Sequence, residues 1–198
     1  VLAVILERVQ TTDPRVLLGP GDDLAEVLVR DEDASLLVGV DQVVDGLHVL
    51  ASRTSWDQIG GKAMRRALSD VAAMAGKPLA SVASVVLPPN AIDADIKALC
   101  KGLHETAAEF DAPLVGGDVA IHRLPDHPLS VSVTVLATPV PPGPVRRRGA
   151  CNGDLLVVTG RLGGSLEDGG GGPHLDFTPR ISEALHLRGL FGKGLHAM

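Results

Sequence analysis

Apolar residues recur at helical spacing in several segments of the chain. In the longest segment, Ile59, Ala63 and Ala67 form one row of a helix, and Gly76 follows as a stop signal. Ser55 is a suitable N-cap for this helix. The pattern as a whole predicts helices over residues 1–10, 55–75, 90–110 and 178–190.

Two glycines, Gly60 and Gly61, lie inside the predicted helix 55–75. Each glycine costs a helix interior about 1 kcal/mol relative to alanine. The pair therefore indicates a place where another backbone packs closely against this helix.

The segments between these helices have the patterns of strands. Residues 36–41 are a nearly continuous apolar run that ends in Asp41, which is typical of a strand buried on both faces. Residues 129–137 alternate apolar with small polar residues, as in a half-exposed antiparallel strand. Further strands are predicted over residues 24–29, 79–87 and 153–159, and a turn over residues 116–118. This order predicts an α+β fold with helices on one face of a mixed or antiparallel sheet.

Four prolines within residues 139–144 mark the boundary between two domains. We assign residues 1–138 to an N-terminal domain, 139–148 to a stiff linker, and 149–198 to the start of a second, α/β domain. The chain begins with Val1 and stops at Met198, directly after a predicted helix. We therefore expect the native chain to continue at both ends.

The amino-acid composition argues against several classes of partner and of site. Aromatic residues make up 2% of the chain and the net charge is −6, which argues against a nucleic-acid partner. The two cysteines form no CxxC pair, so we expect neither a zinc knuckle nor a disulfide framework, and a cytoplasmic location. No apolar run approaches the roughly 20 residues of a membrane-spanning helix, so no membrane association is expected.

Acidic residues stand at turns and at the ends of predicted elements: Asp22 and Asp23, Asp41 and Asp45, Asp70, and Asp118. Two carboxylates about 5 Å apart repel by about 3 kcal/mol at an effective dielectric near 20. Mg²⁺ prefers oxygen ligands and is usually held by one or two carboxylates together with substrate phosphates. The pattern therefore predicts that these groups converge on Mg²⁺ ions that carry nucleotide phosphates.

Each of these residues also has a plainer interpretation. Asp22 and Asp23 could be turn formers, and Asp70 could pair with Arg66 one helical turn earlier. The run Arg146–Arg148 suits phosphate but could be a solvated cluster beside the linker, and His48 could be structural. No P-loop and no Gly-x-Ser-x-Gly elbow occurs, so nothing supports nucleophilic hydrolysis.

Five blocks taken together resemble a known family. In order they are Gly-Asp-Asp at 21–23, Val-Asp-(x)₃-Asp-Gly-x-His at 40–48, Lys-Ala-(x)₄-Leu-Ser-Asp-Val-Ala-Ala-Met at 62–74, Leu-Val-Gly-Gly-Asp at 114–118, and Arg-x-Gly-Ala-(x)₂-Gly-Asp-(x)₄-Thr-Gly at 147–160. This set resembles the thiamine-monophosphate kinases, which belong with aminoimidazole ribonucleotide synthetase and selenophosphate synthetase in one superfamily. The Leu-Ser-Asp-Val-Ala-Ala-Met block is the most specific of the five.

The resemblance implies an activity and an assembly. Members of this family transfer the γ-phosphate of ATP to thiamine monophosphate, giving thiamine diphosphate, with Mg²⁺. They are homodimers whose N-terminal domains share a β-barrel, and their active site lies between the N- and C-terminal domains. A phosphate monoester has its second pKa near 6 and is already largely ionised at pH 7. The acceptor would therefore need no general base.

The resemblance also implies roles for individual residues. The metal-binding aspartates of the family match Asp23, Asp41, Asp70 and Asp118, of which the last three would be catalytic. The nucleotide loop matches Gly117 and Asp118, and the arginine that contacts ATP matches Arg147. Substrate contacts fall on His48 and Asp45. Gly39 and Val40 replace the usual serine or threonine before the strand-end aspartate, which leaves their backbone carbonyls as metal ligands.

The chain departs from the family pattern after Asp118, where Val119-Ala120-Ile121-His122 stands in place of the usual Thr-x-Arg-Gly. The C-terminal Asp-x-Ser-Asp-Gly block of the family is also missing from this sequence. We therefore expect this segment alone to have weak activity or none. Two alternatives stay open. One is a related ATP-dependent synthetase with another substrate; the other is a dimerisation module that binds nucleotide without turnover.

Overall fold

The computed structural model describes residues 13–19, 21–29 and 34–198. The helix expected over residues 1–10 lies outside the described residues. Strands form in the order β1 (Val16–Leu18), β2 (Ala25–Leu28), β3 (Ser35–Val44), β4 (Gly76–Leu87), β5 (Leu114–Ile121) and β6 (Ser130–Pro139). The helices are α2 (Trp56–Ala73), α3 (Asp93–Glu109) and α4 (Ile181–Phe191), with single 3₁₀ turns η1 (Pro173–Leu175) and η2 (Gly192–Gly194).

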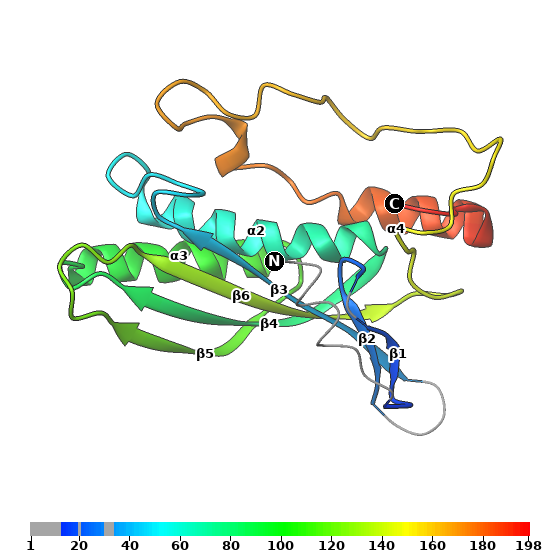
Figure 1. The fold of residues 1–198 in the computed structure, drawn as a ribbon, viewed down its shortest axis with the longest axis horizontal. Helices are drawn as coiled ribbons and strands as arrows, with labels where there is room; N and C mark the ends of the chain where they lie inside the picture. Colours follow the sequence, from blue (N-terminus) through cyan, green and yellow to red (C-terminus); the bar gives the residue numbers. More distant parts are fainter. Residues whose placement is uncertain (1–12, 20, 30–33) are drawn as a thin grey trace.

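The six strands form one mixed sheet in the order β1-β2-β3-β6-β4-β5. Only β4 and β5 run parallel, with α3 as their crossover; every other pair is antiparallel. Helices α2 and α3 cover one face of the sheet, while no helix of the described residues lies on the opposite face (Figure 1). The predicted α+β class with a mixed sheet is confirmed, but the sheet of one chain is open rather than a closed barrel.

The core between the sheet and α2 is aliphatic, as the scarcity of aromatic residues predicts. Odd-numbered residues of β3 and β6 point toward the helices, because side chains alternate across a strand. The largest fully buried side chains of the described residues are Leu, Ile, Met and Val. They include Leu37, Ile59, Met64, Leu68, Val71, Leu99, Val131 and Val133.

Helices α2 and α3 touch through their backbones. A methyl group added at Gly60 would collide with the carbonyl oxygen of Leu99, and one added at Gly102 would collide with the carbonyl oxygen of Asp57. The close packing predicted from the glycines of helix 55–75 is therefore confirmed at Gly60.

Residues 149–198 differ most from the prediction. The strand expected over residues 153–159 does not form; these residues are exposed and irregular, since no strand pairs with them. Helix α4 begins at Ile181, three residues after the predicted start at residue 178. Leu175 and Ile181 nevertheless belong to the main core, and η1 and α4 lie over α2 (Figure 1).

Two other elements differ from the prediction. The turn expected at residues 116–118 is part of strand β5, because the backbone there pairs with β4 from Ser81 to Leu87. Helix α3 begins at Asp93, three residues after the predicted start at residue 90, with Ile92 at its N-cap. None of the helices in the described part of the chain combines the length and apolar character needed to cross a bilayer.

Substituting Gly102 by alanine should destabilise the protein by about 2 kcal/mol or more, because the helices must separate to admit the methyl group. Urea unfolding of the two proteins measures this change. Gly189→Ala is the matched control, since Gly189 is exposed within α4 and an added methyl group there would enter open space. It should stabilise by about 0.5–1 kcal/mol through helix propensity, and a Gly102→Ala variant as stable as this control would contradict the packing.

Candidate functional site

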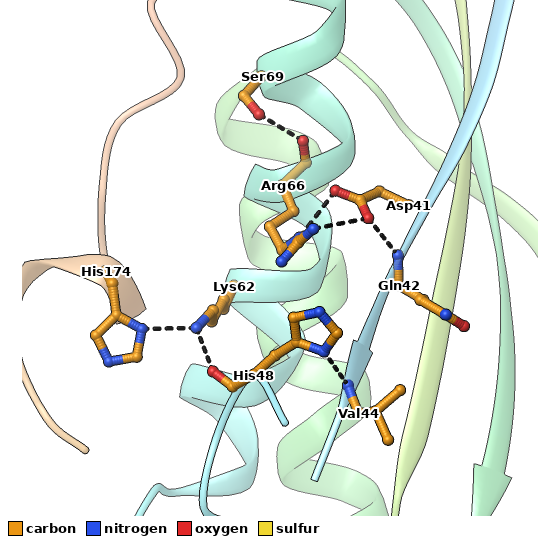
Figure 2. Close-up of polar contacts among 8 residues, drawn as sticks. All are labelled: Asp41, Gln42, Val44, His48, Lys62, Arg66, Ser69 and His174. Carbon is orange, nitrogen blue, oxygen red and sulfur yellow. Dashed lines mark hydrogen bonds and ion pairs between the residues drawn. The ribbon is translucent and has the colours of Figure 1, made fainter. Parts of the chain in front are cut away.

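Three charged side chains lie on one row of α2, spaced four residues apart: Lys62, Arg66 and Asp70. Residues at this spacing share one face of a helix. Lys62 and Arg66 face the C-terminal part of β3 and the residues that follow it (Figure 2). The helical repeat of the sequence thus places two cations and one carboxylate along the line where α2 meets the sheet.

Asp41 meets this row from β3. Its side chain points to the helix face, where Arg66 binds it with two hydrogen bonds, from Nε at 2.8 Å and from Nη2 at 3.0 Å (Figure 2). The backbone N–H of Gln42 donates a third hydrogen bond to the same carboxylate at 2.8 Å. A fork of this kind is the strongest common pairing of arginine with a carboxylate. Arg66 therefore pairs with Asp41, and not with Asp70.

Asp23 reaches the same region from the turn before β2. Gly39 permits this approach, because a side chain there would overlap Leu24. Arg147 donates to Asp23 from Nε at 3.1 Å and from Nη2, and its backbone N–H lies 3.3 Å from a carboxylate oxygen of Asp22. Arg147 is therefore the only member of the run 146–148 that is paired with a carboxylate among the described residues.

Asp70 is the carboxylate of this cluster that lacks a cation of its own. Among the described residues it makes no hydrogen bond or ion pair. Burial raises its pKa to about 6, and the negative charges of Asp41 and Asp23 add to the shift, against the opposing effect of Arg147 and Arg66. The structure therefore brings together Asp23, Asp41 and Asp70, with two arginines for three carboxylates.

Asp118 does not join this cluster within one chain. It lies on the exposed edge strand β5, opposite Ser84, which in turn pairs with Ser132 and through it with Gln42. Paired residues share a face of a sheet, so Asp118 points to the uncovered face. Strand β5 lies three inter-strand spacings from β3, a distance of about 14 Å. Gly117 packs its Cα against the carbonyl of Ala83.

His48 and Asp45 shape the loop after β3. The ring Nδ1 of His48 accepts a hydrogen bond from the backbone N–H of Val44 at 3.1 Å, and burial and the nearby cations Arg66 and Lys62 lower its pKa. Asp45 accepts one from the backbone N–H of Ala51 at 2.8 Å. Gly39 and Val40 lie in the ladder with β6, and the side chain of Val40 points to the uncovered face.

Lys62 is a functional candidate that the sequence reasoning missed. Its side chain is buried, and its Nζ donates to the backbone carbonyl of His48 and contacts Nδ1 of His174 at 2.6 Å (Figure 2). Burial and the charge of Arg66 lower its pKa. The four-residue spacing to Arg66 was the available signal. The contact with His174 ties residues 173–175 to α2, and no sequence pattern pointed to it.

Replacing Asp70 by asparagine should stabilise the metal-free protein at about pH 8 by about 1–2 kcal/mol, after allowance for solvent screening. The folded-state pKa lies above the unfolded value of 3.8, so the native state keeps a proton that the unfolded chain loses between about pH 4 and pH 6. Wild-type stability should therefore fall as pH rises through this window.

The difference in stability between Asp70→Asn and wild type should vanish below about pH 4, where the Asp70 carboxyl is protonated in both the folded and the unfolded protein. Asp41→Asn is the contrast, since it breaks the fork with Arg66 and should destabilise by about 1 kcal/mol. Urea unfolding across pH measures both variants. An Asp70→Asn variant that is less stable than wild type at every pH would contradict the uncompensated charge.

The family described as AIR synthase related protein, N-terminal domain, matches residues 21–138. A thiamine-monophosphate kinase from Rhodopirellula baltica is 35% identical over 181 residues, which cover 88% of this chain and 54% of that protein. The chain spans about half the length of the curated relatives it matches.

Solved structures resemble the chain over most of its length. The structure of AaThiL complexed with AMPPCP and TMP superposes with a TM-score of 0.76 at 25% identity, over 94% of this chain and 61% of that one. Thiamine-monophosphate kinase from Stenotrophomonas maltophilia K279a superposes with a TM-score of 0.69 at 30% identity, over 90% of this chain and 60% of that one.

Proposed function

We propose a function from the premise that this chain belongs to the family of AIR synthase related proteins, whose N-terminal domain corresponds to residues 21–138. The protein transfers the γ-phosphate of ATP to thiamine monophosphate, giving thiamine diphosphate, and requires Mg²⁺. The observation that carries this proposal is the convergence of Asp23, Asp41 and Asp70 in a chain 35% identical to a thiamine-monophosphate kinase. The complex of AaThiL with AMPPCP and TMP supports the same pair of substrates.

The carboxylate cluster fits Mg²⁺. Three aspartates offer oxygen atoms, and the raised pKa of Asp70 reflects negative charge that two arginines leave uncompensated. Asp23, Asp41 and Asp70 would hold the metal, and the backbone carbonyls of Gly39 and Val40 are further ligands in the proposal. When bound, Mg²⁺ supplies positive charge that neutralises and aligns the phosphate groups of the two substrates.

The side chains of the chain itself bind and orient the two anionic substrates. Arg147 stands at the edge of the cluster with a guanidinium fork suited to phosphate oxygens. The acceptor phosphate is largely ionised at pH 7, so no residue need remove its proton. His48 accepts a backbone hydrogen bond at Nδ1, which places the proton of its neutral ring on Nε2 as a donor to thiamine monophosphate. Asp45 holds the loop that positions His48.

We also propose that the protein is a homodimer whose two sheets face each other and close a barrel. The uncovered face of the sheet is the surface available for this contact (Figure 1). It carries apolar side chains, and Val40 is 64% exposed there. Asp118 and the nucleotide loop residue Gly117 lie on β5 at the edge of this sheet. Within one chain Asp118 and Asp41 point to opposite faces of the sheet, so we propose that Asp118 joins the cluster of the partner chain. The two exposed free cysteines suit a cytoplasmic location.

The direct test measures Mg²⁺-dependent conversion of thiamine monophosphate by the full-length protein. Asp70→Asn should lower turnover by at least about 100-fold, because it removes a metal ligand, and Asp126→Asn, in an exposed loop, is the matched control. Mg²⁺ should raise the melting temperature of wild type more than that of Asp70→Asn. No diphosphate product despite normal ATP binding would reject thiamine monophosphate as the substrate, and a panel of other acceptors would then test for a related synthetase.

A mixing experiment tests whether Asp118 acts in the site of the partner chain. The variants Asp118→Asn and Asp70→Asn should each be inactive alone. After subunit exchange in an equal mixture, about a quarter of all sites would be intact if the two residues come from different chains. Activity should then recover toward that fraction. If both residues act in one chain, every site keeps one substitution and the mixture stays inactive, which would overturn the proposal.

A further inference from the structure

A second group of metal-ligating side chains lies outside the carboxylate cluster, in the turn Cys151-Asn152-Gly153-Asp154. The backbone N–H of Asp154 donates to the carbonyl of Cys151 at 3.1 Å, which closes a β-turn with Gly153 at φ +100°. The Asp154 carboxylate in turn accepts the backbone N–H of Cys151 at 2.7 Å. The turn therefore holds the thiol and the carboxylate at its two ends, close together.

His196 completes the group from a distant part of the chain. Its Nδ1 lies 2.9 Å from both carboxylate oxygens of Asp154. This approach depends on Gly149, because any side chain there would overlap the carbonyl oxygen of His196. The segment after α4 and the segment after the linker thus meet backbone to backbone at this point.

A buried arginine fixes both segments. Arg188 of α4 donates to the carbonyl of Gly143 at 2.6 Å and to the carbonyl of Gly192 at 2.7 Å, and it lies 3.4 Å from the carbonyl of Leu195. Arg188 is only 6% exposed. The relative position of His196 and the turn is therefore set by an internal contact, and not by the surface ion pair of His196 with Asp154 alone.

We propose that Cys151, Asp154 and His196 form a binding site for a divalent transition metal of the zinc class. The sulfur, carboxylate oxygen and ring nitrogen all lie within 4.8 Å of one another. Bonds of about 2.0–2.3 Å from one ion to each atom span such separations with small shifts. A thiolate, an imidazole and one carboxylate form a donor set that suits Zn²⁺ or Co²⁺, whereas Mg²⁺ prefers oxygen alone.

The charge balance also suits this site. A divalent ion with one thiolate, one carboxylate and one neutral imidazole has no net charge. The nearby cations Arg146, Arg148 and Lys193, which with His196 line a hollow of about 290 Å³, do not repel such a neutral complex. Binding replaces the thiol proton, which is released to the solvent, and the hydrogen bond between His196 and Asp154 gives way to two metal–ligand bonds. Water completes the coordination.

Cobalt titration tests the site, because a Co²⁺–thiolate bond has its own charge-transfer absorption. The experiment titrates the chain with Co²⁺ in excess Mg²⁺, so that the carboxylate cluster is saturated with a metal that binds oxygen. We expect one Co²⁺ per chain with a thiolate band, and displacement of that band by Zn²⁺. Asp154→Asn and His196→Gln should each weaken the apparent Co²⁺ affinity at least tenfold.

The two cysteines supply a matched pair of variants. Cys151→Ser should abolish the thiolate band, whereas Cys100→Ser, on the exposed face of α3, should leave it unchanged. Absence of the band in wild type, or its survival in Cys151→Ser, would overturn the site. Either result is independent of the proposed kinase activity, because the readout is a sulfur–metal bond and the carboxylate cluster contains no sulfur.

Discussion

The backbone contact between α2 and α3 determines where the charged side chains of α2 lie relative to β3. Because Gly60 and Gly102 have no side chains, the two helices pack as one layer on the sheet. That packing buries the aliphatic face of α2 and leaves Lys62 and Arg66 at its border with β3, with Asp70 one turn farther along the same row, near Asp41. A helix displaced by even one side-chain layer would no longer present this row to the end of β3.

The charges at this border do not cancel, because three carboxylates meet only two arginines that pair with them. Arg66 and Arg147 each pair with a carboxylate, and half-buried Asp70 lies beside two negative charges with no hydrogen-bond or ion-pair partner among the described residues. Proteins seldom keep such a carboxylate unless something else compensates it. A metal ion that arrives with nucleotide phosphates would do so, and the metal-free protein would then be held slightly below its attainable stability at the place where it acts.

The residues after the linker are attached to this arrangement, although they hold little regular structure. His174 contacts the buried Lys62, and Leu175 adds to the core over α2. Farther along, Arg188 joins the linker to the end of α4. The proposed zinc-class site at Cys151 would strengthen that second junction. It would do so with ligands distinct from those of the carboxylate cluster, so one chain could bind two kinds of metal in separate places.

The sequence by itself determined the helices that cover the sheet and the strand that delivers Asp41, because hydrophobic period and local turn chemistry are encoded in neighbouring residues. The grouping of Asp23 and Asp70 with Asp41 was a prediction from the acidic pattern and the family resemblance, and their proximity follows from the tertiary structure. Only the tertiary structure decided that Arg66 pairs with Asp41, since that choice depends on where a strand and a helix meet. It also decided that residues 116–118 form a strand and that residues 153–159 do not. Strand formation requires a partner backbone, and the face to which Asp118 points follows from the register with that partner, which no local pattern specifies.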